Sequence, residues 1–133
     1  MERILPITPI AAPRQNRNSR FNPKKKAVIE RYIAWKTAVV YLAKQAGVDF
    51  SQDELHVVFI LPMPKSWSPK KQRDFAGTPY KRERNDTDNL VKALKDAFWP
   101  KSSGGDGHIW RESQERRWGY EGKIVIQQEE KCV

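Results

Sequence analysis

Residues 54–61 have the sequence Glu-Leu-His-Val-Val-Phe-Ile-Leu, and this stretch predicts a β-strand in the interior of a sheet. Every odd-numbered residue from 55 to 61 is apolar, and two of the three even-numbered residues between them are apolar as well. Successive side chains of a strand point to opposite faces, so both faces of this strand are largely suited to burial. Pro62 and Pro64 end it, because proline has no amide hydrogen to give to a neighbouring strand.

Two helices are expected, one before this strand and one after it. The first begins at Pro23 and stops near Gly47, and the second runs from about Thr87 to Trp99, just before Pro100. Apolar residues of the first helix follow a 4-3-4-3-4 spacing, which places them on one face. They are Val28, Tyr32, Trp35, Val39, Leu42 and Ala46.

The other strands are predicted near the two ends of the chain. Residues 3–10 contain two prolines and are expected as a short edge strand. Residues 108–118 and 123–128 are expected as antiparallel strands, with Gly119 and Gly122 bracketing the turn between them. The segment 65–84 has no period and is predicted as a long loop that contacts a ligand. The prediction is therefore an α+β fold in a single domain, residues 1–133, with a mixed or antiparallel sheet of about four strands and two helices on one face.

Charge is distributed unevenly along the chain, whose formal net charge is +9. Residues 14–36 contain eight Lys or Arg and one acid, and residues 65–84 contain seven and two. Two basic segments on a small protein favour binding to a polyanion such as nucleic acid, although loops kept soluble by charge are the alternative. No apolar run is long enough to span a membrane. Cys132 is the only cysteine, which excludes an internal disulfide and a cysteine-based zinc site and favours a cytoplasmic location.

The expected second helix carries a polar face opposite its core face. At about 100° per residue, Asp88, Lys92 and Asp96 follow one another over successive turns, while the apolar residues occupy the opposite side. A purely structural explanation also exists. Asp86 or Thr87 would cap the helix, and Lys92 would form ion pairs with Asp88 or Asp96. However, carboxylates repel phosphate, so an acidic pair in a nucleic-acid-binding chain suggests a bound divalent cation.

This stretch also resembles a known family. The run Asn85-Asp86-x-Asp88-Asn89-Leu90-x-Lys92-x-x-x-Asp96-Ala97-Phe98 is similar to the signature Pro-Asp-x-Asp-Asn-Leu-x-Lys-x-x-x-Asp-Ala-Leu of the RusA-type endodeoxyribonucleases, which are Holliday junction resolvases of bacteria, prophages and phages. Seven positions match at fixed spacing. The segment from Pro13 to Pro23 resembles the basic loop near the N-terminus of that family.

The resemblance implies a function and a set of site residues. Asp86 and Asp88 match the aspartates that hold the metal, Lys92 matches the lysine required for cleavage, and Asp106 matches a third acid. The implied cofactor is Mg²⁺, with Mn²⁺ as a substitute, and the implied partners are branched DNA and a second copy of the chain. The basic residues expected to bind DNA are Arg14, Arg17, Arg20, Lys24, Lys25, Lys70, Lys71, Arg73, Lys81, Arg82 and Arg84.

At the third acid this chain departs from the family pattern, because the family usually has an Asp-Asp pair where this chain has Gly105-Asp106. Asp96 is the alternative. It lies two turns from Asp88, about 12 Å along the helix axis, which is too far for one metal ion, so Asp106 is expected to complete the site. His108 is a possible auxiliary residue. Tryptophans are more often core residues than base-stacking surfaces, and Trp67, in the basic segment, is the one to test for stacking on an unpaired base.

Two other functions fit the same pattern. One is a nuclease that cuts flaps or forks without preferring four-way junctions. The other is a non-catalytic nucleic-acid-binding module, in which the acids serve only as caps and ion pairs.

Overall fold

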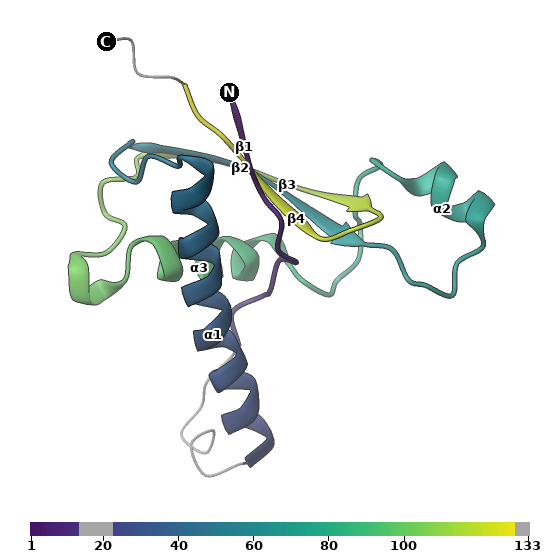
Figure 1. The fold of residues 1–133 in the computed structure, drawn as a ribbon, viewed down its shortest axis with the longest axis horizontal. Coiled ribbons are helices and arrows are strands. Elements are labelled where there is room, and N and C mark those ends of the chain that lie inside the picture. Colours follow the sequence, from purple (N-terminus) through teal and green to yellow (C-terminus); the bar gives the residue numbers. More distant parts are fainter. Residues whose placement is uncertain (14–22, 130–133) are drawn as a thin grey trace.

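A four-stranded sheet forms the centre of the molecule (Figure 1). The structure is a computed structural model, and it describes residues 1–13 and 23–129. The strand order is β1-β4-β2-β3, with β2 parallel to β3 and antiparallel to β4, and with β4 antiparallel to β1. The predictions of a mixed sheet, of an interior strand at 54–61 and of an edge strand at the N-terminus are confirmed. The strands are β1 (Glu2–Leu5), β2 (Glu54–Pro62), β3 (Arg111–Gly119) and β4 (Lys123–Gln127).

The last two strands are not neighbours, although the sequence suggested that they follow one another across a short turn. β2 lies between them and pairs with both. Because β2 is the most apolar strand, it takes an interior position in which both of its edges are hydrogen-bonded. The turn from β3 to β4 must therefore cross the end of β2. Glycine is required there, because a Cβ at Gly119 would overlap the Ile60 side chain and one at Gly122 would lie 2.6 Å from the Cα of Thr8.

Helix α1 (Pro23–Ala46) has the predicted bounds. Gly47, with a φ of +81°, ends it in the left-handed conformation, and the Val48 amide donates to the Ala43 carbonyl at 3.0 Å. Tyr32, Trp35, Val39 and Ala43 form the buried stripe. Val28, which was expected on this stripe, is exposed, because the N-terminal end of α1 extends beyond the sheet (Figure 1).

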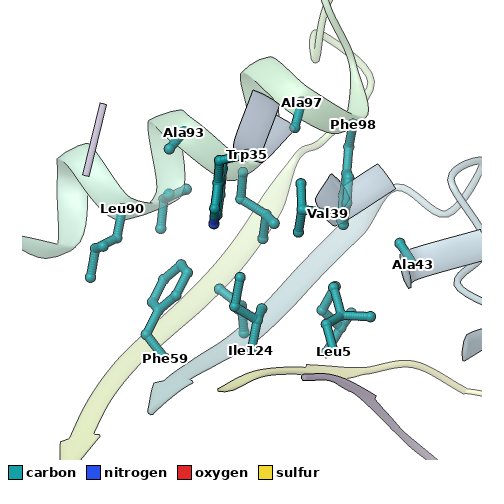
Figure 2. Close-up of a cluster of buried hydrophobic side chains, with 14 of the residues drawn as sticks. Leu5, Trp35, Val39, Ala43, Phe59, Leu90, Ala93, Ala97, Phe98 and Ile124 are labelled. Atoms are coloured by element: carbon teal, nitrogen blue, oxygen red, sulfur yellow. The ribbon is translucent and has the colours of Figure 1, made fainter. Parts of the chain in front are cut away.

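Helix α3 (Thr87–Phe98) packs with α1 on the same face of the sheet. Figure 2 shows the packing of this face. The α3 side chains Leu90, Ala93, Ala97 and Phe98 lie above the strand residues Phe59, Ile124 and Leu5. Trp35 and Val39 of α1 lie between these two sets. The predicted α+β class and the two helices on one face are therefore confirmed. A single 3-10 turn, η2 (Lys101–Ser103), follows α3.

The basic segment 65–84 was predicted to be a loop, but it contains the short helix α2 (Pro69–Phe75). Ser68 caps this helix by accepting the Lys71 amide at 3.2 Å, and Pro69 occupies its first turn. None of its residues is buried, so it has no apolar period to reveal it. α2 lies beyond the end of the sheet (Figure 1), where Trp67 contacts Trp118 with the ring centroids 4.9 Å apart.

The crossing turn provides a test of this topology. Gly122→Ala should lower the free energy of unfolding by about 1–3 kcal/mol, because the added methyl group meets the backbone of Thr8. Gly107→Ala is the matched control, since nothing lies within 4 Å of its added Cβ, and it should change stability by no more than about 0.5 kcal/mol. Urea denaturation followed by tryptophan fluorescence measures both variants. Equal losses would contradict the close approach.

Candidate active site

The start of α3 is fixed by Asp86, which is its N-cap. One carboxylate oxygen of Asp86 accepts the Asn89 amide at 2.8 Å, and the other accepts the Asn89 side-chain amide at 3.2 Å. Of the two residues expected as a cap, Asp86 therefore takes the role and Thr87 is the first helical residue. Asp88 follows in the first turn with its side chain exposed, where the helix dipole favours a negative charge.

The polar face of α3 borders a small cavity of about 230 Å³. Asp88, Lys92 and Asp106 line it, so the structure brings together three of the four residues predicted for the site. Asp86 lies at the helix start and is not part of this lining. Asp96 lines the cavity as well, so both candidates for the third acid face the same space. The turn that places Asp106 at the cavity contains Gly104 and Gly105, whose φ values are +106° and +76°.

The opposite wall of the cavity is formed by β3. Its residues Glu112, Gln114 and Arg116 pair in register with Leu55, Val57 and Phe59 of β2. They therefore share the core face of the sheet, but β3 is an edge strand and turns polar side chains toward α3. Glu112 and Gln114 line the cavity. These residues were not predicted from the sequence, because residues 111–117 are all polar and no alternation marks which of them face inward.

Two lysines of α3 differ in their partners. The Lys95 ammonium lies 2.6 Å from a Glu112 carboxylate oxygen and 3.7 Å from an Asp106 oxygen, and its side chain is mostly buried. Lys92 forms no ion pair with any described residue, so the alternative explanation of Lys92 as an ion-pair partner of Asp88 or Asp96 does not hold. Lys95 is thus paired with acids of the site, whereas the Lys92 ammonium can bind an anion. The ion pairs of Lys95 were not predicted from the sequence.

Asp96 has a structural partner on α1. The Tyr32 hydroxyl donates to Asp96 at 3.1 Å and links the two helices. Burial raises the pKa of Tyr32 well above its ordinary value, and the neighbouring Asp96 charge and the hydrogen bond raise it further. Tyr32 therefore stays protonated and continues to donate this hydrogen bond.

Arg116 holds the segment that leads into α3. One nitrogen of its guanidinium, Nη1, donates to the carbonyls of Arg82, Arg84 and Asn85 at 2.8, 3.3 and 3.1 Å. Asn85 has a φ of +56°, a left-handed conformation that asparagine tolerates better than most residues. Arg116 thus stabilises an unusual backbone next to Asp86, and the sequence alone gave no signal for this contact.

The donor atoms of the cavity suit a hard divalent cation. Asp88, Asp106 and Glu112 line it together with Gln114, whose Oε1 is buried and has no hydrogen-bond partner in the part of the chain that the structure describes. The acids do not converge fully, since within residues 1–13 and 23–129 no three acidic, histidine or cysteine side chains are close enough to hold one ion. His108 packs edge-on against Trp99, with the ring centroids 5.1 Å apart, and does not line the cavity.

The predicted DNA-binding residues divide into three groups. Lys24 and Lys25 lie in the first turn of α1, while Arg14, Arg17 and Arg20 fall outside the described residues. The remaining basic residues are exposed on α2 or on the segment between α2 and α3: Lys70, Lys71, Arg73, Lys81, Arg82 and Arg84.

Trp67 is not arranged as an open stacking surface. Its ring contacts Trp118 and Phe75, and the Lys71 ammonium lies 4.2 Å from its centroid. These contacts give Trp67 a structural role, which is to attach α2 to the sheet, and its stacking on a base stays a prediction.

Comparison with known proteins gives one match. The family model described as "Endodeoxyribonuclease RusA" matches residues 6–129 of the chain. No curated protein and no solved structure gives a significant match. Among the described helices, none combines the length and apolarity needed to cross a membrane.

The Arg116 contact can be tested through stability. Arg116→Met should lower the free energy of unfolding by about 1.5–3 kcal/mol, since three carbonyls lose a charged donor. Hydrogen exchange should also become faster at the amides of residues 86–90. Arg111→Met is the control, because the Arg111 side chain is 65% exposed and its ion pair with Glu54 is long, at 3.7 Å. A loss in Arg116→Met no larger than in this control would contradict the role of Arg116.

Proposed function

This chain belongs to the RusA endodeoxyribonuclease family, and we propose that it resolves four-way DNA junctions by paired, magnesium-dependent nicking. The observation that carries the proposal is the cavity lined by Asp88, Asp106 and Lys92, the last of which pairs with no acid among the described residues. Carboxylates alone would repel a DNA backbone, so their place in a chain of net charge +9 is explained by a cation between them and the phosphate.

Asp86, Asp88 and Asp106 are the proposed ligands of Mg²⁺, for which Mn²⁺ can substitute. Both oxygens of Asp86 accept hydrogen bonds from Asn89, yet each keeps a further lone pair for a metal or its water. A bound divalent cation supplies an activated water and neutralises charge on the phosphate. The unpartnered Gln114 Oε1 supports the proposal, because a metal-bound water is a donor that this oxygen could accept from.

The side chains of α3 have separate roles in this proposal. Lys92, with no acid paired to it, holds a non-bridging oxygen of the scissile phosphate and stabilises the charge that develops there. Lys95 is drawn toward Glu112, at 2.6 Å against 3.7 Å for Asp106. Glu112 thereby limits the competition of the Lys95 ammonium with a metal ion for Asp106.

A four-way junction has near two-fold symmetry and needs two opposed nicks, so the proposed active form is a homodimer with one site per subunit. The basic residues of α2 and of segments 14–25 and 81–84 contact the phosphate backbone. The proposed setting is recombination, repair or phage DNA processing in the cytoplasm.

The first test separates binding from cutting. Asp88→Asn should lower the rate of junction cleavage by more than about 100-fold, a larger loss than changes outside the ligand shell usually cause. Its junction affinity in metal-free buffer should stay the same or rise, because one charge that repels phosphate is gone. Measurements use a synthetic four-way junction beside matched flap and linear duplex, with and without Mg²⁺.

Asp53→Asn is the control, since it removes an exposed carboxylate outside the cavity. The wild-type protein should place two near-symmetric nicks in the junction and cut the other substrates more slowly. Equal loss of binding and cleavage in folded Asp88→Asn would contradict its role as a ligand. Equal rates on all substrates would contradict junction resolution.

The second test decides between the two candidates for the third acid. Asp106→Asn should abolish cleavage as fully as Asp88→Asn and weaken Mn²⁺ binding measured by electron paramagnetic resonance. Asp96→Asn should keep substantial activity and lose no more than about 1 kcal/mol of stability, because its amide oxygen can still accept the Tyr32 hydroxyl and only the charge is lost. Tyr32→Phe, which removes the donor and keeps the acid, should also keep activity but lose more stability, about 1–3 kcal/mol. A folded but inactive Asp96→Asn, beside an active Asp106→Asn, would reverse the assignment.

A further inference from the structure

A second cavity adjoins the acid-lined one, in the groove between α1 and α3. Its volume is about 700 Å³, and it shares Lys92 and Asp96 with the smaller cavity. Lys36 of α1 and Lys101 of η2 line it as well. The two cavities are therefore neighbours, with the polar face of α3 between them.

The two cavities differ in charge. The smaller one is lined by four acids, Asp88, Asp96, Asp106 and Glu112, and by two lysines. The groove is lined by three lysines, Lys36, Lys92 and Lys101, and by the single acid Asp96. A polyanion is therefore repelled by the first cavity unless a cation is present, whereas it is attracted by the groove.

The lysines of the groove are not neutralised by neighbours. None of the three forms an ion pair with another described residue. The Lys36 ammonium lies 4.8 Å from the centroid of the Tyr32 ring, which positions it without cancelling its charge. The one acid, Asp96, accepts the hydrogen bond of the Tyr32 hydroxyl at 3.1 Å and is thereby held toward α1.

We propose that this groove is a subsite for the DNA strand next to the cut, in which Lys36 and Lys101 bind the phosphates that flank the scissile one. The inference rests on the proposed function and extends it. A strand whose scissile phosphate contacts Lys92 must leave the acid-lined cavity over a surface that does not repel it. The groove begins at Lys92 and offers two further ammonium groups along that path.

The test uses the full chain and the double variant Lys36→Gln/Lys101→Gln. Junction binding is measured by fluorescence anisotropy in metal-free buffer over roughly 50–200 mM salt. Each lost phosphate contact lowers the slope of log affinity against log salt by about 0.9, so the double variant should lose up to about 1.8. Lys44→Gln/Lys123→Gln is the control, because it removes the same two charges from exposed positions that do not line the groove.

A second measurement locates the contact on the DNA. Once the cut has been mapped in wild-type protein, neutral methylphosphonates replace the phosphates that flank it. Their cost in affinity should be large for the wild type and for the control and small for Lys36→Gln/Lys101→Gln, because the partner lysines are already absent there. Binding of Mn²⁺ to the free double variant should equal that of the wild type.

A double variant with the wild-type salt slope, or with the slope of the control, would overturn the subsite. So would methylphosphonate costs that are the same in all three proteins. In both cases wild-type cleavage of the junction would leave the proposed function intact. A wild-type protein that neither binds nor cuts a junction would instead overturn the proposed function and the subsite with it.

Discussion

The burial of the apolar face of α3 is the interaction on which the site depends. Leu90, Leu94 and Phe98 pack into the core, and full burial of side chains of this size contributes about 1.5–3 kcal/mol each. A rotation of the helix about its axis would expose them. The opposite face, with Asp88 and Lys92, is therefore held at a fixed angle to β3, so that acids from the helix, the loop and the strand line one cavity.

The edge position of β3 explains why its inward residues can be polar. A charged side chain in the centre of the sheet would be cut off from water, but Glu112 lies at the margin and keeps partial access. Its ion pair with Lys95, at 2.6 Å, forms in a half-buried setting where attraction is stronger than at an open surface. The site is thus assembled at the boundary of the core, where rigidity and hydration are both available.

The sequence predicted those parts of the fold that have a long apolar period: both main helices and the interior strand at 54–61. It did not predict α2, whose seven residues bury nothing, although Ser68 and Pro69 are typical of a helix start. It also suggested a simple turn between β3 and β4, because local pairing is the default, whereas the insertion of β2 between them depends on contacts distant in sequence. In the site, Asp88 and Lys92 came from one motif and Asp106 from the wider family resemblance, while Glu112 and Arg116 act through β3 and have no local signature.

The separation of charge across α3 has a consequence for control of the proposed activity. The positive field of the chain attracts DNA at long range and needs no cofactor. The acid-lined cavity acts in the opposite sense at short range, because Asp88, Asp106 and Glu112 repel a phosphate that approaches without a cation. In the proposed function, binding and cutting then have different requirements. The lysines bind the strand at the edge of the site, and the phosphate enters the cavity only when a cation compensates the charge of the acids. A nuclease built in this way can hold branched DNA without cutting it.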